Sequence, residues 1–273
     1  MSHLHVARLV YRLKTDGTWT FEDPPKVERQ TDAFFLRLED DMLYVSMREH
    51  HETAGSARTR VEKYLRSWEI SAGLQYDGTS EMWFEFVRAE VLDLTEHPRA
   101  PTGTPPVVVR LSAGSMSIAA GAATAHVTSR SYPNPPDHFT VSEDVEVMWT
   151  LYQRYRKDRE RLLTMAATCL SWLRFRAQQN DPTTGKKSLN KKVEQQYNIE
   201  IDVLRKLGEL TANLGVGVEA RKVYGGSQLR NPTHGERKWI EEAIKKIIRR
   251  VGEHAADPQG VLPKITMANL AQL

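Results

Sequence analysis

The sequence predicts an α+β protein with two domains: a mainly antiparallel β domain with one helix over residues 1–139, and a basic, all-helical domain over residues 140–273. Three observations predict this. Short segments of alternating apolar and polar residues, separated by turns, fill the first half. Apolar residues at helical spacing fill the second half. A long segment without glycine or proline, residues 140–179, connects the two as a predicted helix.

The first strands follow from alternation and from turn residues. Residues 6–13 alternate with the period of a half-buried strand, and Asp16-Gly17 after them predicts a turn. Residues 33–39 and 42–48 flank Asp40-Asp41, so we expect a hairpin with these two aspartates at its tip.

A single helix is predicted in the β domain. Residues 57–68 carry apolar side chains at spacings of three and four, which indicates a helix packed on the sheet. After it, residues 68–74 and 81–87 surround Asp77-Gly78, a strong two-residue hairpin signal. We therefore expect a second hairpin there.

The β domain ends in proline-rich segments. Residues 97–106 contain several prolines and predict a loop, and residues 107–111 and 123–129 after it predict strands. The prolines of residues 132–136 keep the backbone extended and prevent a helix from starting early.

The connecting helix has two apolar stripes. Thr140 and Glu143 occupy the positions of a capping box. The first stripe lies within residues 145–152 and the second within 162–173, with the polar segment RYRKDRER at 154–161 between them. We expect a bend at this segment, the first stripe packed on the β domain and the second in the helical core.

Three further helices are predicted: residues 188–197, residues 200–214, and residues 235–251 after a cap at Thr233. The apolar, proline-containing end, residues 261–273, is extended. We expect it to pack back on its own core; the alternative is that it docks on a protein partner.

Composition narrows the class of protein. No apolar run reaches the roughly 20 residues of a membrane helix, and the N-terminus lacks the pattern of a signal peptide, so no membrane association and a cytoplasmic location are expected. The single cysteine, Cys169, excludes an internal disulfide and a thiolate zinc site. Residues 49–52, EHHE, do not form a metal site in this interpretation, because neighbouring side chains of an extended segment face opposite ways. Neither metal nor cofactor is predicted.

Charge is divided unevenly along the chain. Residues 1–140 carry 15 Lys/Arg against 19 Asp/Glu, a net of −4, and residues 141–273 carry 23 against 16, a net of +7. From Arg154 to Arg250 there are 22 basic against 11 acidic residues, which favours binding to DNA or RNA; the alternative is an ordinary solvated helical surface. The predicted contact residues are Arg154, Arg156, Lys157, Lys186, Lys187, Lys191, Lys192, Arg205, Lys206, Lys245, Lys246, Arg249 and Arg250.

Residues 193–207 resemble a helix-turn-helix, with Asn198 in the turn. However, Glu194 stands where the helices would cross, and Glu200 and Asp202 begin the helix that would approach DNA. Carboxylates there repel phosphates. We therefore expect a helical hairpin used for packing rather than for reading DNA.

Arg249 and His254 have the spacing of the Arg and His in HEPN-type ribonucleases, an all-helical class that cleaves RNA without metal. The resemblance implies that Arg249 stabilises the phosphate and that His254 takes part in acid–base chemistry. The alternative is that the basic residues near the end of this helix favour its C-terminus.

The C-terminal residues 235–253 and 262–270, ending in LPKITMANL, resemble the end of a family of bacterial proteins with no assigned activity. The leading hypothesis is a non-enzymatic bacterial binding or accessory protein that contacts nucleic acid through its helical domain. The alternatives are a HEPN-like ribonuclease of a defence or toxin system, and a structural subunit that docks through residues 261–273.

Overall fold

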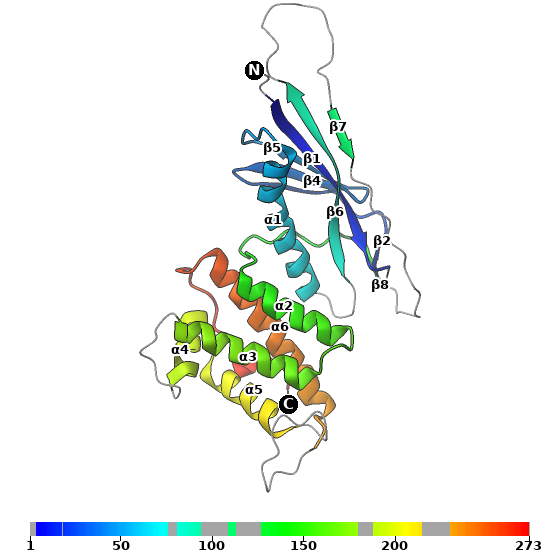
Figure 1. Cartoon of the computed structure of the whole chain (residues 1–273). Helices are drawn as coiled ribbons and strands as arrows, with labels where there is room; N and C mark the ends of the chain where they lie inside the picture. The colour runs from blue at the N-terminus through cyan, green and yellow to red at the C-terminus, as the bar shows by residue number, and fades with distance from the viewer. Residues whose placement is uncertain are drawn as a thin grey trace, which may run out of the picture. The chain divides into compact units, whose positions relative to one another are not determined.

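The chain is made of two units, Met1–Asp137 and His138–Leu273 (Figure 1). The structure is a computed structural model that describes residues 4–17, 19–75, 81–93, 109–112, 127–179, 188–214 and 230–272. The first unit is mostly β and the second is helical. The predicted α+β class is therefore confirmed.

The first unit is built on a six-stranded antiparallel sheet with the strand order β3-β4-β5-β1-β6-β7. Its long central strands β1 and β6 pair along most of their length, and β1 also pairs with β5. The strands are β1 (Leu4–Thr15), β3 (Val27–Gln30), β4 (Phe34–Glu39), β5 (Met42–Met47), β6 (Met82–Asp93) and β7 (Val109–Ser112).

The predicted hairpin at Asp40-Asp41 is confirmed: β4 and β5 pair from Phe34↔Met47 to Glu39↔Met42. Both aspartates have a positive φ, 49° and 56°, which the tight turns of hairpins require. The alternation in β4 and β5 places Leu36 and Leu43 in the core.

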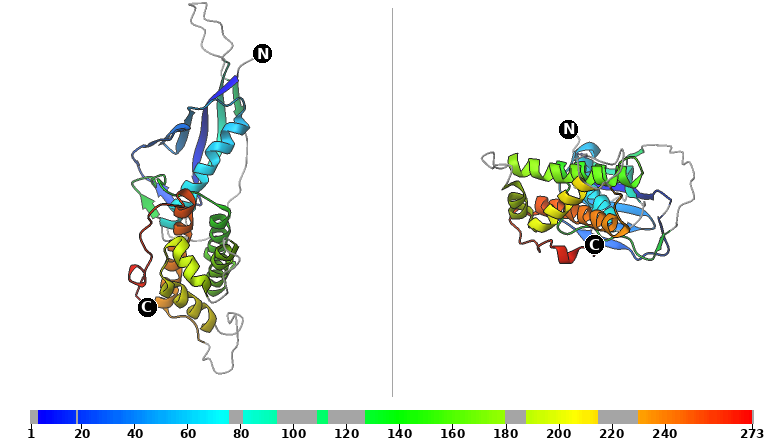
Figure 2. Two further views of the ribbon diagram at one scale, coloured as in Figure 1. Left: turned by 90° about the vertical axis from the view of Figure 1, so that its left-hand side faces the viewer. Right: turned by 90° about the horizontal axis from the view of Figure 1, so that it is seen from below.

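The helix α1 (Ala54–Gln75) covers one face of the sheet (Figure 2). It is longer than predicted, and residues 68–74 belong to it, so the predicted strand there is wrong. The reason is that Val61, Leu65, Trp68 and Ala72 continue the helical spacing and are all buried. Asp77-Gly78 lies outside the described residues, and β6 pairs with β1 rather than with residues 68–74.

A small parallel pair completes the unit: β2 (Trp19–Phe21) lies beside β8 (Val127–Ser129). The predicted strands 107–111 and 123–129 are thus confirmed in the parts that the structure describes, as β7 and β8. β8 pairs with β2 and is not part of the main sheet.

The second unit is an array of packed helices that begins with an antiparallel pair (Figure 1). The helices are α2 (Glu143–Arg156), α3 (Leu162–Gln179), α4 (Leu189–Tyr197), α5 (Ile201–Asn213), α6 (His234–Ala256) and the short 3₁₀ helix Met267–Asn269.

The predicted connecting helix is two helices, α2 and α3, and the expected bend is a complete break between them. Asp158 has φ 54° there, which ends α2. The cap of α2 is Ser142 rather than Thr140, whose N–H donates to the carbonyl of Gly252 in α6. The first apolar stripe is buried, and α2 packs on α3 and α6.

The start of the second unit fits tightly against α6. A Cβ atom on Gly252 would lie 2.2 Å from the ring of Phe139, so only glycine permits this approach. Among the residues that the structure describes, no helix is long and apolar enough to cross a membrane.

Two histidine rings stack where β1 begins. The rings of His5 and His50 have centroids 5.2 Å apart and an interplanar angle of 18°. Burial, followed by the neighbouring charges of His50 and His51, lowers the pKa of His5 from its ordinary value of 6.5. The folded chain therefore favours the neutral ring and binds fewer protons here than the unfolded chain.

We predict that the stability of the protein falls as the pH drops through 6.5, because protonation of His5 is disfavoured in the fold. Thermal unfolding between about pH 7.5 and pH 5 measures this. The variant His5→Asn should lose less stability over this interval than the wild type, whereas His138→Asn, at an exposed histidine, should follow the wild type. A His5→Asn profile identical to the wild type would contradict the prediction.

Candidate nucleic-acid interface

The predicted contact residues lie on four helices of the second unit. Lys186 and Lys187 fall outside the described residues. The others are Arg154 and Arg156 of α2 with Lys157 at its end, Lys191 and Lys192 of α4, Arg205 and Lys206 of α5, and Lys245, Lys246, Arg249 and Arg250 of α6.

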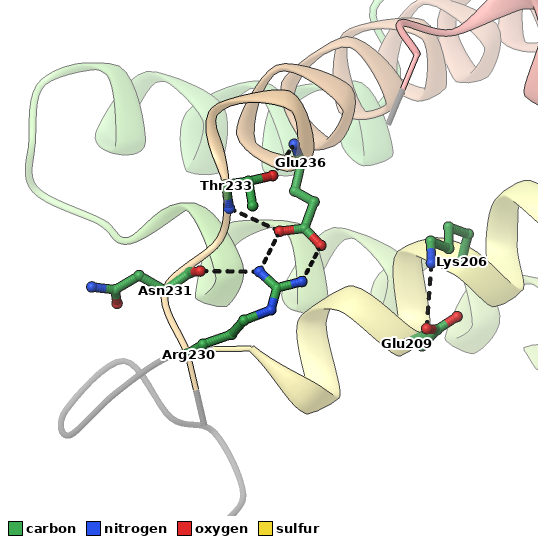
Figure 3. A network of polar contacts seen from close by, with 6 residues as sticks. All are labelled: Lys206, Glu209, Arg230, Asn231, Thr233 and Glu236. Carbon is green, nitrogen blue, oxygen red and sulfur yellow. Dashed lines mark hydrogen bonds and ion pairs between the residues drawn. The ribbon is translucent and has the colours of Figure 1, made fainter. Parts of the chain in front are cut away.

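Several of these cations are neutralised by carboxylates of their own helix. Arg205 pairs with Asp202 at 3.0 Å and Lys206 with Glu209 at 3.3 Å, both one turn apart on α5 (the second is drawn in Figure 3). On α6, Lys246 pairs with Glu242 at 2.9 Å. The exposed side of α5 therefore carries paired charges that attract a polyanion only weakly.

Arg250 is a structural residue. Its side chain is only 5% exposed. Its guanidinium donates to the carbonyls of Tyr197 (2.9 Å), Asn198 (3.2 Å) and Pro263, and pairs with Glu253 at 3.0 Å. A buried charge needs such partners, so Arg250 is not available to an external phosphate.

A tight turn joins α4 and α5. Asn198 adopts the left-handed conformation at the turn (φ 50°, ψ 45°), as its position in the sequence predicts. Val193, Tyr197, Leu204 and Leu207 are buried. The burial of these side chains supports the prediction that the helical hairpin serves for packing, as does the C-terminal segment that lies over the turn.

The C-terminal segment covers that turn. Ile265 forms a parallel bridge with Ile199, and the N–H of Met267 donates to Glu200 at the start of α5 (2.9 Å). Ile265 and Leu270 are buried. The prediction that this end packs back on its own core is confirmed, and the start of α5, which would approach DNA, is occupied by the chain itself.

The same segment makes polar contacts with α4 and α6. Lys264 pairs with Glu194 at 2.7 Å, which lowers the pKa of that carboxyl. The N–H of Ala271 donates to Glu242 (2.7 Å). Glu194 is thus paired with Lys264, a contact that could not be predicted from the position of Glu194 in the helix-turn-helix pattern.

Arg249 and His254 are five residues apart on α6, which at 3.6 residues per turn places them about 140° apart around the helix axis. The ring of His254 packs edge-on against Tyr197 (centroids 5.1 Å apart), and burial lowers its pKa. No hydrogen bond or ion pair joins Arg249 to His254 among the described residues. Their role in RNA cleavage remains a prediction.

A different set of cations gathers where α2 ends. We define the basic corner as Arg154, Arg156, Lys157 and Arg159 of the α2–α3 connection together with Arg237 of α6. All but the half-buried Arg156 are exposed. Tyr155 of α2 contacts Glu241, one turn after Arg237 on α6, so the first turns of α6 lie beside the end of α2.

The backbone of the corner is fixed by local hydrogen bonds. The N–H of Lys157 donates to Gln153 (3.0 Å), that of Asp158 to Tyr155 (3.0 Å), and that of Arg159 to Arg154 (2.8 Å). The positive φ of Asp158 allows this close turn. The cations are thus held on a preformed support.

Two aromatic residues attach the corner to the core. The hydroxyl of Tyr155 donates to Glu241 of α6, and burial with this contact raises its pKa. The guanidinium of Arg156 lies over the ring of Tyr152, 5.7 Å from its centroid. Tyr152 itself is buried.

The arginines of the corner differ from the cations of α5 in their ion pairing. Within the described part of the chain, Arg154, Arg156, Arg159 and Arg237 form no ion pair. Arg159 and Arg237 were not among the predicted contact residues, although the polar segment RYRKDRER had marked this region. A count of charges along the sequence does not separate paired from unpaired cations.

The start of α6 holds a paired arginine, in contrast to the arginines of the corner (Figure 3). Arg230 makes two contacts of 2.7 Å with Glu236, whose carboxylate also accepts from the N–H of Thr233 (2.8 Å). These contacts lower the pKa of Glu236 to about 2. Thr233 caps α6 as predicted, and Arg230 is committed to the cap.

The described residues offer no evident centre for other chemistry. They contain no group of histidine, cysteine and carboxylate residues arranged to hold a metal ion. Burial raises the pKa of Cys169 to about 12, so its thiol stays protonated at neutral pH. Comparison with known proteins gave no match: no protein-family model, curated protein or solved structure is significantly similar to the chain.

We predict that Arg250→Ala lowers the free energy of unfolding of the helical unit by about 3 kcal/mol, because the carbonyls of Tyr197, Asn198 and Pro263 lose their buried donor. Urea unfolding followed by circular dichroism measures this. Proteolysis after Lys264 should also become faster.

The matched control is Arg205→Ala, which removes an exposed, paired arginine of the same unit and should change the free energy by less than about 0.5 kcal/mol. Equal stability of Arg250→Ala and the wild type would refute the structural role of Arg250.

Proposed function

We propose that the protein is a non-enzymatic binding protein that contacts the phosphates of nucleic acid through the basic corner. The observation that carries the proposal is that Arg154, Arg156 and Arg159 lie at the end of α2, which packs on α6 with Arg237, and that these four arginines form no ion pair within the described residues. An unpaired cation can neutralise a phosphate and release its counterions without first breaking an internal contact.

The remaining basic surface supports this choice of site. Arg205 and Lys206 of α5 and Lys246 of α6 pair with Asp202, Glu209 and Glu242. To bind a phosphate, each of those cations would have to leave a carboxylate that would then lie close to the ligand. The four arginines of the corner would not have to break an ion pair of this kind, although Asp158 and Glu160 lie in the same loop.

The corner also has the preorganised geometry that binding favours. Arg156 is restrained by the ring of Tyr152, and the backbone from Lys157 to Arg159 is held by three hydrogen bonds. A ligand that binds there orders few additional backbone bonds, so less of the contact free energy is lost on binding.

The test compares two triple variants with the same change in charge. The corner variant is Arg154→Gln, Arg159→Gln and Arg237→Gln. The control variant is Arg205→Gln, Lys206→Gln and Lys246→Gln, all at paired cations. Both variants should keep the circular dichroism spectrum of the wild type, because surface charges contribute little to stability.

At about 50 mM salt, where phosphate contacts are strong, we expect the corner variant to bind a nucleic acid at least about tenfold more weakly than the wild type, and the control variant to lose less than about threefold. Fluorescence anisotropy measures both. No binding by the wild type, or an equal loss in the two variants, would contradict the proposal.

A further inference from the structure

The described residues of the basic corner offer cationic groups but no exposed aromatic ring. Tyr152 is buried beneath Arg156, and the hydroxyl of the half-buried Tyr155 is bound to Glu241. Proteins that hold single strands combine a basic groove with aromatic rings on which bases stack, and stacking contributes much of their affinity. The corner therefore has the groups that bind phosphate and lacks those that bind an unpaired base.

The chemistry at the corner also lacks groups that read base edges in pairs. The exposed side chains are arginine and lysine, with Asp158 between them. Arginine can contact guanine, but these arginines are divided between the end of α2, the turn after it and the start of α6, rather than lying along one helix that could enter a groove. Contacts of this kind position a protein on a nucleic acid without selecting its sequence.

Cations carried on a fixed backbone favour a ligand whose phosphates are already fixed in space. A duplex carries one charge per about 1.7 Å of its axis and holds its phosphates at a set spacing. A flexible single strand must be ordered on binding, and the described residues of the corner offer no aromatic ring whose stacking with bases would offset that loss of entropy. Both effects favour the duplex.

We infer that the ligand of the basic corner is double-stranded nucleic acid, recognised through its phosphates and without regard to base sequence. The inference rests on the proposed function of the corner and specifies its class of ligand. Duplex DNA and duplex RNA share the chemistry that the corner recognises, and the experiment treats them as separate arms.

The test uses the full chain and ligands with equal numbers of phosphates: duplex DNAs of about 20 base pairs with two unrelated sequences, a duplex RNA of the same length, and unstructured single strands of about 40 nucleotides. We expect the two DNA duplexes to bind equally and every duplex to bind at least about tenfold more tightly than the single strands. With four or five phosphates contacted, the logarithm of the binding constant should fall with the logarithm of salt with a slope of about −4.

The outcomes separate the two proposals. Single strands that bind as tightly as duplexes, or a strong preference for one DNA sequence, would overturn the inference while leaving the proposed function intact. Absence of binding to every ligand at low salt would overturn both. The corner variant Arg154→Gln, Arg159→Gln and Arg237→Gln should lose its preference for duplexes, and an unchanged preference would place duplex recognition elsewhere on the chain.

Discussion

The second unit depends on one buried charge. The guanidinium of Arg250, on α6, donates to the carbonyls of Tyr197 and Asn198 at the α4–α5 turn and to the carbonyl of Pro263 in the C-terminal segment. Because a buried cation without partners is costly, the turn and the segment must both be in place for α6 to pack. The C-terminal segment also covers the start of α5, through the bridge of Ile265 with Ile199 and the contact of Met267 with Glu200.

The sequence predicted correctly those elements that depend only on neighbouring residues, such as turns and helix caps. Asp40-Asp41 forms a hairpin tip because the two residues tolerate positive φ, and Thr233 caps α6 with Glu236 three residues later. Residues 68–74 were assigned wrongly because they alternate as a strand would, while their helical spacing is decided by burial against a sheet whose strands lie elsewhere in the sequence. The break at Asp158 was predicted as a bend, because the polar segment was evident and its positive φ was not.

The candidate site could be predicted only in part. The sequence identified a basic helical half and included Arg154, Arg156 and Lys157. It also counted Arg250, whose burial depends on Pro263 and on the turn at Asn198, which is some fifty residues away. Arg237 was missed because its nearness to α2 is a tertiary relation, seen through Tyr155. Ion pairing, which separates structural from available cations, is set by packing and cannot be counted along the chain.

The central claim is that nucleic acid binds at the basic corner, whose arginines form no ion pair within the described residues, and not at the paired cations Arg205, Lys206 and Lys246. Formaldehyde cross-linking to duplex DNA, followed by mass mapping of the modified peptides, tests it most directly because it reports position rather than affinity. The account predicts cross-links at Lys157, within the basic corner, and none at Lys206 or Lys246, which pair with Glu209 and Glu242. Cross-links at Lys206 and Lys246 with none at Lys157 would contradict it.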